Sequence, residues 1–571
     1  MTSTDTDLLV LGGGLSGLTL ALQVLRARPS TRVLVVEKAS WPPPVAAHKV
    51  GESTVELGTH YLREVLGLAD YLDAEQLPKI GLRFFFRTTP DAPLSERPEY
   101  GATGELPVPS HQLDRGLFEA ELARRVQAAG GTFVPETRVT GVELDKQGHR
   151  VTLDGARSGT VTTRWVVDGT GRASTLKRTL GLLKTTDHGA SAAWFRVDRP
   201  IDPDSWDDDP EFRGRVPEGV RRLSTNHLMG PGYWVWLIPL VSGSTSIGIV
   251  ADPDVHPLKT YSTPERALAW LREHEPRCAH ALGELDGLQD FKLLRHYSHH
   301  TERLISPARW ALTGDAGAFL DPFYSPGTDF IALANTYISD CVVRDLDGER
   351  IRSRANEYDR TFREMIDAWM PVYLRMYATF GVDRVLALKV TWDFSTYWAF
   401  QVPTFANNGF TDPMFMARSR RLWQRITDVN RNLQANLLHW ARREDEPAGM
   451  GPGFTDPMSL DYLREFHVSM TRPLDPAALE ARLERNLEVL ETVAAEITRL
   501  GAHRLYGFDL EAPIDPGSFS FEALARDEEQ QSPGALRAVD GGIRADLMRC
   551  RAVDLPGTLA TPSREFAQSP I

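Results

Sequence analysis

Lys79 has the residue type and setting to act as a reactive primary amine. It stands in the segment L-P-K-I-G-L-R-F-F-F at residues 77–86, just before an apolar run typical of a buried strand. Burial beside aromatic rings would lower the pKa of a lysine from its usual ~10.4 and raise its neutral fraction. Such an amine can capture or hydrogen-bond a small oxidant, whereas an arginine keeps its charge permanently. The alternative is a solvated lysine at the start of a strand, because lysine is almost never fully buried.

The loop F-L-D-P-F-Y-S-P-G at residues 319–327 is a second feature that could do chemistry. Glycine lets backbone N–H groups approach a small anion or a flat ring, as in an anion nest. Pro326 has no N–H, so Gly327 and Thr328 are the donors that remain in this turn. Ser325 adds a hydroxyl to the same loop. The loop therefore predicts a site for a small anion or a ring.

Trp234 and Trp236 stand two residues apart in the β-type run W-V-W-L-I-P. Side chains at this spacing on a strand point to one face of the sheet, so the two indoles can form one apolar wall. Half-buried tryptophans on a strand are most often core residues. A wall that shields a reactive site is compatible with that reading.

Two other groups have a structural explanation first. Asp321 and Asp329 are expected to be loop caps or solvated acids, because nothing in their spacing makes them face each other. The aromatic-dense segment 392–400 is expected to be core, since aromatic residues dominate core energetics. A roof over a substrate is the second interpretation of that segment.

The N-terminal segment has the fingerprint of dinucleotide binding. An apolar run at residues 7–11 leads into G-G-G-L-S-G, an apolar helix at about residues 18–25, and a second β-run that stops at Glu37. Gly12 allows the turn, Gly14 lets the backbone approach a pyrophosphate, and Gly17 lets helix and strand pack closely. The helix N-terminus offers donors to phosphates. We assign as cofactor-contacting residues Gly12, Gly14, Leu15, Ser16, Gly17, Glu37 and Lys38.

Two more short apolar strands run into glycine turns. One spans residues 165–172 and includes Asp168, and the other spans residues 309–316 and includes Gly314 and Asp315. Their wide separation predicts one Rossmann-like nucleotide domain interrupted by insertions, hence an α/β fold that is α+β overall. The expected boundaries are residues 1–184 for this domain, with short inserted strands at about 80–110, a β-rich substrate region over 185–300, and a return to the first domain over 301–345.

The chain is predicted to be mostly helical over residues 346–525. Tyr358, Phe362, Met365, Ile366 and Trp369 fall on one apolar stripe at helical spacing. A second helix is expected to begin at residues 475–476, with a capping aspartate and a proline at its first position, and to end at a glycine, residue 501. Residues 526–571 are expected to be loosely structured.

The overall composition excludes several classes of protein. The 571 residues include 64 basic and 77 acidic side chains, and the formal charge of -13 argues against sequence-independent nucleic-acid binding. No apolar run approaches the roughly 20 residues of a membrane span, and the N-terminus lacks the regions of a secretory signal. The three cysteines are too far apart for a disulfide framework or a metal motif. We therefore expect a cytoplasmic protein without nucleic-acid or membrane partners and without a metal.

Taken together, these motifs resemble the flavin-dependent halogenases, whose fold is that of the p-hydroxybenzoate-hydroxylase-like flavoproteins. The tryptophan pair fills the family pattern W-x-W-x-I-P, the loop fills F-x-x-P-x-x-S-x-G, and the likeness covers roughly residues 5–345. The resemblance implies that the nucleotide is FAD. The flavin-contacting residues that it adds are Glu52, Ser53, Arg115, Asp168, Gly314, Asp315 and Pro322.

The same resemblance implies a division of roles. Reduced FAD, oxygen and chloride or bromide give hypohalous acid, which is relayed to the catalytic Lys79 through a passage that contains Ser325. Gly327 and Thr328 are implied as halide ligands. The two tryptophans form a hydrophobic barrier that keeps the substrate away from the flavin.

Tyr324 departs from one branch of the family. Tryptophan-type halogenases carry a glutamate before the loop serine, so tyrosine at this position favours a phenolic or pyrrolic substrate in natural-product biosynthesis, free or tethered to a carrier protein. No second nucleotide fingerprint is visible, so a separate flavin reductase is the expected source of reduced FAD, although related single-component hydroxylases bind NADPH without one. An aromatic hydroxylase or a prenyl-chain reductase of the same fold stays an alternative, which Lys79 and the tryptophan pair disfavour. A catalytically silent flavin-binding or carrier-docking protein is a third.

Overall fold

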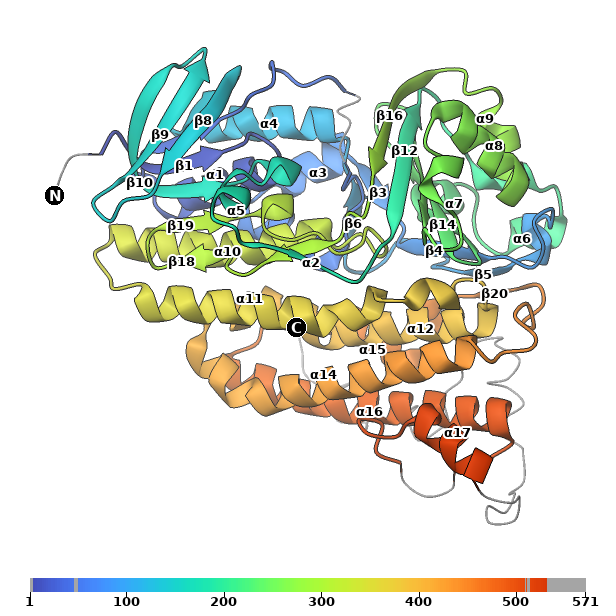
Figure 1. The fold of residues 1–571 in the computed structure, drawn as a ribbon. Helices are drawn as coiled ribbons and strands as arrows, with labels where there is room; N and C mark the ends of the chain where they lie inside the picture. The colour runs from blue at the N-terminus through green and yellow to red at the C-terminus, as the bar shows by residue number, and fades with distance from the viewer. Residues whose placement is uncertain (1–3, 46–49, 509, 511–513, 531–571) are drawn as a thin grey trace.

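The computed structural model describes residues 4–45, 50–508, 510 and 514–530. Figure 1 shows two sheets with their covering helices in the upper half of the molecule and a layer of long helices beneath them. The α/β fold class with a helical C-terminal region is confirmed.

The first sheet is built around parallel strands. β1 (Thr6–Leu11) pairs in parallel with β2 (Val33–Val36) on one side and with β10 (Gly159–Asp168) on the other. β10 in turn pairs in parallel with β19 (Trp310–Leu312). All residues of β1 and β2 apart from the half-buried Asp7 are buried, as expected for a sheet covered on both faces. The outer strands of this sheet are β7 (Thr132–Val134), β8 (Thr137–Glu143), β9 (His149–Gly155) and β18 (Ile305–Ser306).

The parallel register brings three distant glycine turns to one edge. Leu11 is opposite Asp168, and Asp168 is opposite Leu312, so β1, β10 and β19 end side by side. Ligands of open α/β sheets bind outside the carboxyl ends of the strands. The interrupted nucleotide domain predicted from the sequence therefore has its binding edge here.

The second sheet has eight strands in the order β16-β12-β15-β14-β13-β4-β5-β20. β14 (Tyr233–Pro239) carries the tryptophan pair near its centre. β20 (Gly453–Thr455) comes from the helical region and extends the edge beside β5. The other strands are β4 (Leu82–Phe86), β5 (Pro98–Tyr100), β12 (Ser191–Val197), β13 (Thr225–Gly230), β15 (Thr245–Ala251) and β16 (Leu288–Leu294).

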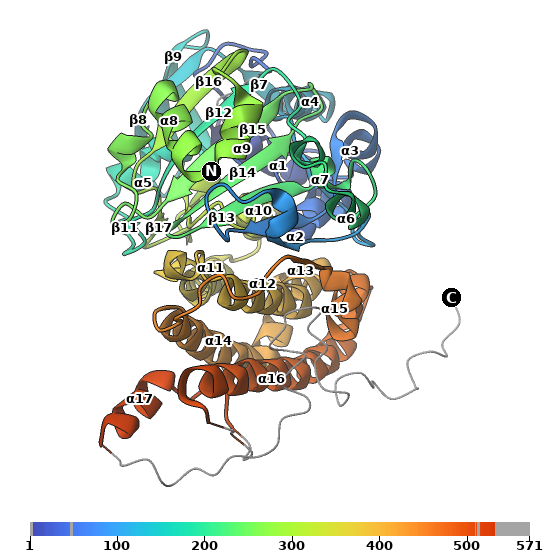
Figure 2. The same ribbon diagram turned by 90° about the vertical axis from the view of Figure 1, so that its right-hand side faces the viewer.

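The helices divide between the two halves of the molecule. α1 (Leu15–Ala27) packs against α4 (Arg115–Ala128) and α10 (Gly327–Leu346) in the upper half. Figure 2 shows the later helices below this half. They are α11 (Arg352–Tyr373), α12 (Asp383–Thr396), α13 (Val402–Ala406), α14 (Pro413–Ala441), α15 (Asp461–Ser469), α16 (Pro476–Tyr506) and α17 (Phe521–Gln530).

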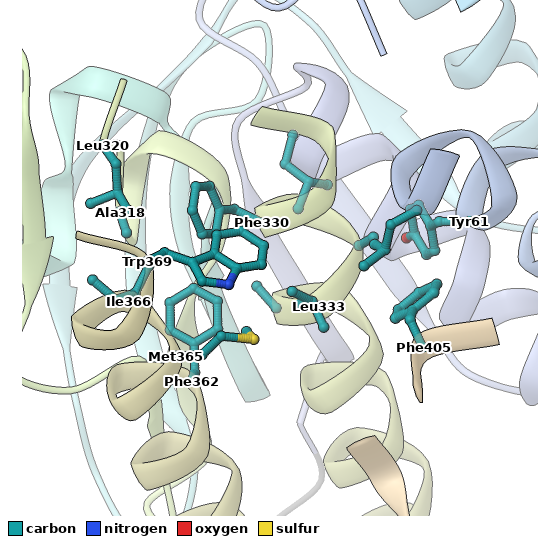
Figure 3. Close-up of a cluster of buried hydrophobic side chains, with 14 of the residues drawn as sticks. Tyr61, Ala318, Leu320, Phe330, Leu333, Phe362, Met365, Ile366, Trp369 and Phe405 are labelled. Carbon is teal, nitrogen blue, oxygen red and sulfur yellow. The ribbon is translucent and has the colours of Figure 1, made fainter. Parts of the chain in front are cut away.

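The predicted apolar stripe of α11 joins the helical region to the upper half. Phe362, Ile366 and Trp369 are buried, and Figure 3 shows Phe362 and Trp369 close to Phe330 of α10. The ring centroids of Phe330 and Trp369 lie 4.9 Å apart. α10 therefore has one end in the loop 319–327 and one flank in the core beneath it.

α16 begins as the sequence predicts and ends later. Asp475 accepts hydrogen bonds from the N–H groups of Ala477 and Ala478, and Pro476 is the first helical residue. The predicted end at Gly501 is wrong, because this glycine lies inside the helix and is close-packed. A Cβ there would come within 2.5 Å of the Phe521 ring, so the glycine serves packing. The helix ends at Gly507, which has a left-handed φ of 66°.

The C-terminal segment lies largely outside the description. α17 runs to Gln530, so the first residues of the segment expected to be loosely structured are helical. Residues 531–571 of that prediction lie outside the described residues. None of the described helices is long and apolar enough to cross a membrane.

Candidate active site

The first glycine turn is shaped for close backbone approach. Gly12 has φ 106°, and a Cβ on it would lie 2.4 Å from the carbonyl oxygen of Gly169. A Cβ on Gly17 would lie 2.1 Å from the oxygen of Gly12. Glu37, at the end of β2, accepts a hydrogen bond from the N–H of Gly13 at 2.8 Å. The turn tolerates no side chain at these points, as a pyrophosphate cradle requires.

We expect Gly17→Ala to weaken FAD binding at least about tenfold, because the added methyl collides with backbone and not with a movable side chain. Fluorescence quenching on titration of FAD into the apoprotein measures this affinity. Gly104→Ala is the matched control, since a Cβ at Gly104 meets nothing within 4 Å. Equal FAD affinity in the two variants would contradict the assignment.

A cavity of about 610 Å³ opens at this edge of the first sheet. Its volume lies within the range of small-molecule and cofactor sites. The sequence-predicted residues that line it are Gly12, Gly14, Leu15, Ser16, Glu37, Lys38, Glu52, Ser53, Arg115, Trp234, Trp236, Gly314, Asp315, Pro322, Ser325, Gly327 and Thr328. Residues from remote parts of the chain thus meet around one space, which we call the flavin cavity.

Two predicted contact residues lie behind its surface. Gly17 packs beneath the turn. Asp168 is fully buried and accepts hydrogen bonds from the N–H groups of Thr170 and Leu176. Its carboxylate therefore holds the second glycine turn in shape and does not line the flavin cavity.

Arg115 fixes the loop that forms the rim of the flavin cavity. Its guanidinium donates to the carbonyl oxygens of Val50 and Gly51, at 2.7 and 3.2 Å, and to the carboxylate of Glu119 at 2.6 Å. Glu52 is buried and pairs with Arg196 at 2.8 Å. Burial nevertheless raises the pKa of Glu52, because desolvation outweighs the arginine. The loop thus presents backbone and a restrained carboxyl to the flavin cavity.

The two tryptophans lie on the flavin side. Trp234 and Trp236 are buried, with ring centroids 5.6 Å apart. The indole N–H of Trp234 donates to the hydroxyl of Tyr377 at 3.0 Å, and that hydroxyl donates to Asp321. Neither tryptophan is among the described residues that line a second cavity, which contains Lys79.

Asp321 is a buried hub. Of the two roles expected for it, the solvated acid is wrong, whereas its Oδ1 accepts a hydrogen bond from the N–H of Phe323 at 2.8 Å, as a loop cap does. Its carboxylate accepts from the hydroxyls of Tyr297 and Tyr377, at 2.8 and 2.9 Å, and lies 2.5 Å from the imidazole Nε2 of His188. It is 2% exposed. These contacts anchor the loop 319–327 to His188 and Tyr297 of the upper half and, through Tyr377, to the helical region, because buried polar groups that are fully hydrogen-bonded rigidify their surroundings.

The loop 319–327 divides two cavities. Tyr324 and Ser325 both have left-handed backbones, with φ of 70° and 58°. Ser325 lines the flavin cavity, Tyr324 lines a second cavity, and Pro326 lines both. Strained non-glycine residues of this kind cluster at functional sites. We call the stretch 324–326 the partition.

The second cavity contains Lys79 and is called the lysine cavity. It has a volume of about 90 Å³ and lies between the second sheet, the first turn of α10 and the helical region. Lys79 ends β3 (Leu77–Lys79), which pairs with β6 (Ser110–Gln112). Lys79 is 4% exposed, and its amine donates to the carbonyl oxygen of Thr54 at 2.6 Å. The alternative interpretation, a solvated lysine, is wrong, because this side chain is enclosed.

Burial lowers the pKa of Lys79 to about 7, against the opposing pull of Glu56 and Asp329. Asp329 is 1% exposed, so the solvated acid, one of the two roles expected for it, is wrong here as well. It accepts from the N–H of Gly58 and the hydroxyl of Tyr397, and burial raises its pKa to about 7. Lysine and acid thus have similar proton affinities, which suits proton transfer near neutral pH.

Several lining residues of the lysine cavity escaped the sequence analysis. Glu56 and Asp393 carry carboxylates into it, and neither stands in a recognisable motif. Phe394, Tyr397 and Trp398 of the aromatic-dense segment line it as well, while Trp392 and Phe400 are core residues. The sequence signal for the aromatic residues was the aromatic density of the segment 392–400. A roof over a substrate was the second interpretation of that segment, after core packing. Tyr397 begins a π-helical turn (Tyr397–Gln401), a feature frequent at functional sites.

Comparison with known proteins agrees with this geometry. The family described as FAD binding domain matches residues 5–224. Flavin-dependent halogenase chlA of Dictyostelium discoideum is 27% identical over 72% of this chain and 72% of its own length. A 1H-pyrrole-2-carbonyl-(peptidyl-carrier protein) chlorinase of Pseudomonas fluorescens is 24% identical over 65% and 83%. The crystal structure of halogenase PltM, 15% identical, superposes with a TM-score of 0.60 over 86% of this chain and 96% of that one.

The glycine cradle, the parallel sheet and the flavin cavity define an FAD-binding flavoprotein. The halogenase relatives match about two thirds or more of this chain, and the tryptophan pair and the loop 319–327 are both present. The class therefore narrows from FAD-binding flavoproteins to halogenases. This chain belongs to the flavin-dependent halogenase family.

Proposed function

We propose that this protein halogenates a small electron-rich aromatic ring, phenolic or pyrrolic, with chloride or bromide, in natural-product biosynthesis. The observation that carries the proposal is the enclosed Lys79 in a cavity of its own, separated from the flavin cavity by the partition 324–326. Bound FAD supplies the oxygen activation that converts halide to hypohalous acid. The protein's task is then to carry that oxidant past the partition and aim it.

Lys79 is suited to receive the oxidant. Its ammonium can donate a hydrogen bond to hypohalous acid, or its neutral form can take up the halogen, and a pKa of about 7 populates both forms near neutral pH. Glu56 and Asp329 hold the amine in place by charge. Ser325 lines the flavin side of the partition and adds a hydroxyl to the route.

The halide is proposed to bind where α10 begins. Gly327 and Thr328 are the first two residues of this helix, whose N–H groups have no intrahelical partners. In the described structure the Thr328 hydroxyl oxygen is buried without a hydrogen-bond partner, and Thr328 lines the flavin cavity. A halide would accept from the unpaired hydroxyl and the two N–H groups.

We expect Thr328→Val to raise the KM for bromide about tenfold with little change in kcat at saturating bromide, because one hydrogen bond to the anion is lost. Steady-state kinetics over a bromide series measure this. Thr140→Val, at an exposed strand position, is the control. An unchanged bromide KM in Thr328→Val would remove Thr328 from the halide site.

The size of the lysine cavity restricts the substrate. At about 90 Å³ it is smaller than the ~150 Å³ cavity that admits benzene, so one ring is the largest group that enters, with small movements of the walls. Relatives act on such rings: the chlorinase above on a carrier-bound pyrrole, and halogenase PltM has been crystallised with phloroglucinol and FAD. A carrier-tethered ring is compatible only if its arm stays outside. A separate reductase is proposed as the source of reduced FAD.

The test supplies chemically reduced FAD, oxygen and bromide together with a panel of one-ring phenols and pyrrole-2-carboxyl thioesters. Mass spectrometry is expected to show the bromine isotope doublet on at least one ring. A hydroxylated product, with rapid bleaching of the bound flavin by NADPH alone, would establish the aromatic hydroxylase instead. No product and no consumption of reduced flavin would indicate a silent flavin-binding protein.

A further inference from the structure

A second charged cluster, centred on Asp393, lines the lysine cavity and has no role in the proposed capture of the oxidant by Lys79. Asp393 of α12 is 6% exposed and lines the cavity together with Tyr324. The Tyr324 hydroxyl donates to Asp393 Oδ2 at 2.8 Å, and the fully buried Lys389 donates to the same oxygen at 2.6 Å. Gln434 donates to Oδ1 at 2.6 Å. Three donors thus fix the carboxylate, and Lys389 balances its charge.

The carboxylate retains capacity for one more donor. A carboxylate offers about four acceptor positions, and in the described part of the chain three donors reach Asp393. The remaining position is on Oδ1. A charged acceptor at a cavity wall favours a ligand with an O–H or N–H group.

The cluster is separate from the one that surrounds Lys79. The acids that act on the Lys79 ammonium are Glu56 and Asp329, whereas Asp393 is committed to Tyr324 and Lys389. Both clusters face the same cavity, whose walls include the rings of Phe394 and Trp398. Phe394 and Trp398 contact each other, with ring centroids 5.1 Å apart, and so form one aromatic wall. A flat ring packed against that wall meets an amine with one part of its edge and a carboxylate with another.

The backbone indicates that the Tyr324 side chain is placed for use. A bulky residue with φ of 70° is uncommon and strained. The strain is retained beside a second left-handed residue, Ser325, and it turns the phenol into the lysine cavity. There Asp393 already holds one phenolic hydroxyl, that of Tyr324.

We propose that Asp393 and Tyr324 bind the ring hydroxyl of a phenolic substrate, and that the Asp393 carboxylate accepts its proton during halogenation. This inference rests on the proposed function and names the substrate class of the same cavity. It assigns to Asp393 the stabilisation of the positively charged ring intermediate. The hydrogen bond strengthens as that charge develops, which is the condition for catalysis.

Lys79 and Asp393 have opposite roles in the halogenation step: Lys79 first donates a proton and Asp393 first accepts one. An electron pair of the ring forms the carbon–halogen bond as the oxygen–halogen bond of hypohalous acid breaks. The departing hydroxide takes a proton from the Lys79 ammonium and leaves as water, while the ring hydroxyl gives its proton to Asp393. The resulting halodienone returns its ring proton to the Lys79 amine and regains the hydroxyl proton from Asp393. Phenol and hypohalous acid have become halophenol and water, and both side chains are reset.

The experiment compares a one-ring phenol with its methyl ether in three proteins: wild type, Tyr324→Phe, and the double variant Asp393→Asn/Lys389→Met. The double variant removes both members of the buried ion pair, so no charge is left uncompensated. We expect the wild type to prefer the phenol far more than free hypobromous acid does at the same pH. The double variant should lose about 100-fold and Tyr324→Phe about tenfold in kcat/KM on the phenol, with little change on the ether. Equilibrium binding of the phenol to the FAD-loaded proteins should weaken in the same order.

Three results would overturn the inference. They are a phenol-to-ether ratio equal to that of free hypobromous acid, equal losses on both substrates, and a preference for pyrrole with rejection of N-methylpyrrole, which would show that the acceptor recognises an N–H. Failure of the proposed function is distinguishable, since the wild type would then halogenate no ring at all. FAD affinity and thermal unfolding identify a variant that has merely misfolded, and Tyr324→Phe keeps its ring packing in any case.

Discussion

Replacement of Lys79 by methionine is expected to reduce halogenation by about 1,000-fold or more. The amine is the only lysine among the described residues that line the lysine cavity, and methionine fills its space without a donor or a nucleophile. In the proposed reaction, oxidation of the halide takes place across the partition and does not need the Lys79 amine. We therefore expect Lys79→Met to keep binding FAD, consuming reduced flavin and releasing hypohalous acid, which a diffusible scavenger in the medium captures.

The measurement pairs product formation with scavenger halogenation in the same reaction. Lys184→Met changes an exposed lysine on the strand β11 (Leu183–Thr185) and is the matched control. A variant at position 79 that halogenates substrate at the wild-type rate would reject the relay. Loss of scavenger halogenation together with product would place Lys79 in halide oxidation instead.

Local rules predicted the nucleotide edge of this fold well. The turn at Gly12 and Gly17 follows from backbone geometry within one strand–turn–helix unit, and the parallel register then brings the turns after Asp168 and Leu312 beside it. Each of these signals is short-range in sequence. The partition residues 324–326 were likewise visible as a motif, although the left-handed backbone of Tyr324 was not.

The lysine cavity could be predicted only in part. Glu56, Asp329 and Asp393 come from three distant segments and converge through packing of the helical region onto the second sheet. An isolated acid in a sequence is usually solvated, so nothing local distinguished these carboxylates from surface residues. The wrong prediction at Gly501 has the same cause. A capping rule interprets this glycine as a helix end, whereas it is required for close packing against Phe521, which is distant in the sequence.

The buried Lys79 also affects how the stability of the fold depends on pH. Its pKa is about 7 in the folded protein and 10.5 as a free side chain. Because the folded value is the lower one, the unfolded chain binds more protons between these two pH values, and stability rises with pH across that window. Below pH 7 the cost of burying the ammonium is fully present. At ~1.4 kcal/mol per pKa unit the cost is on the order of 5 kcal/mol.

Lys79→Met is therefore expected to be more stable than the wild type by on the order of 5 kcal/mol at pH 6, with the gain falling towards zero as the pH rises through 10.5. Glu56 and Asp329 lose an opposite charge in this variant, but their attraction is already contained in the lysine pKa. Chemical denaturation at pH 6, 8 and 10 measures the difference, and Lys184→Met should show no such trend. A destabilised Lys79→Met at pH 6 would mean that the ammonium is a structural ion-pair partner of the two acids. A stabilised but inactive variant would show that the fold tolerates a costly buried charge for the sake of its chemistry, the stability–activity trade-off expected of a residue kept for function.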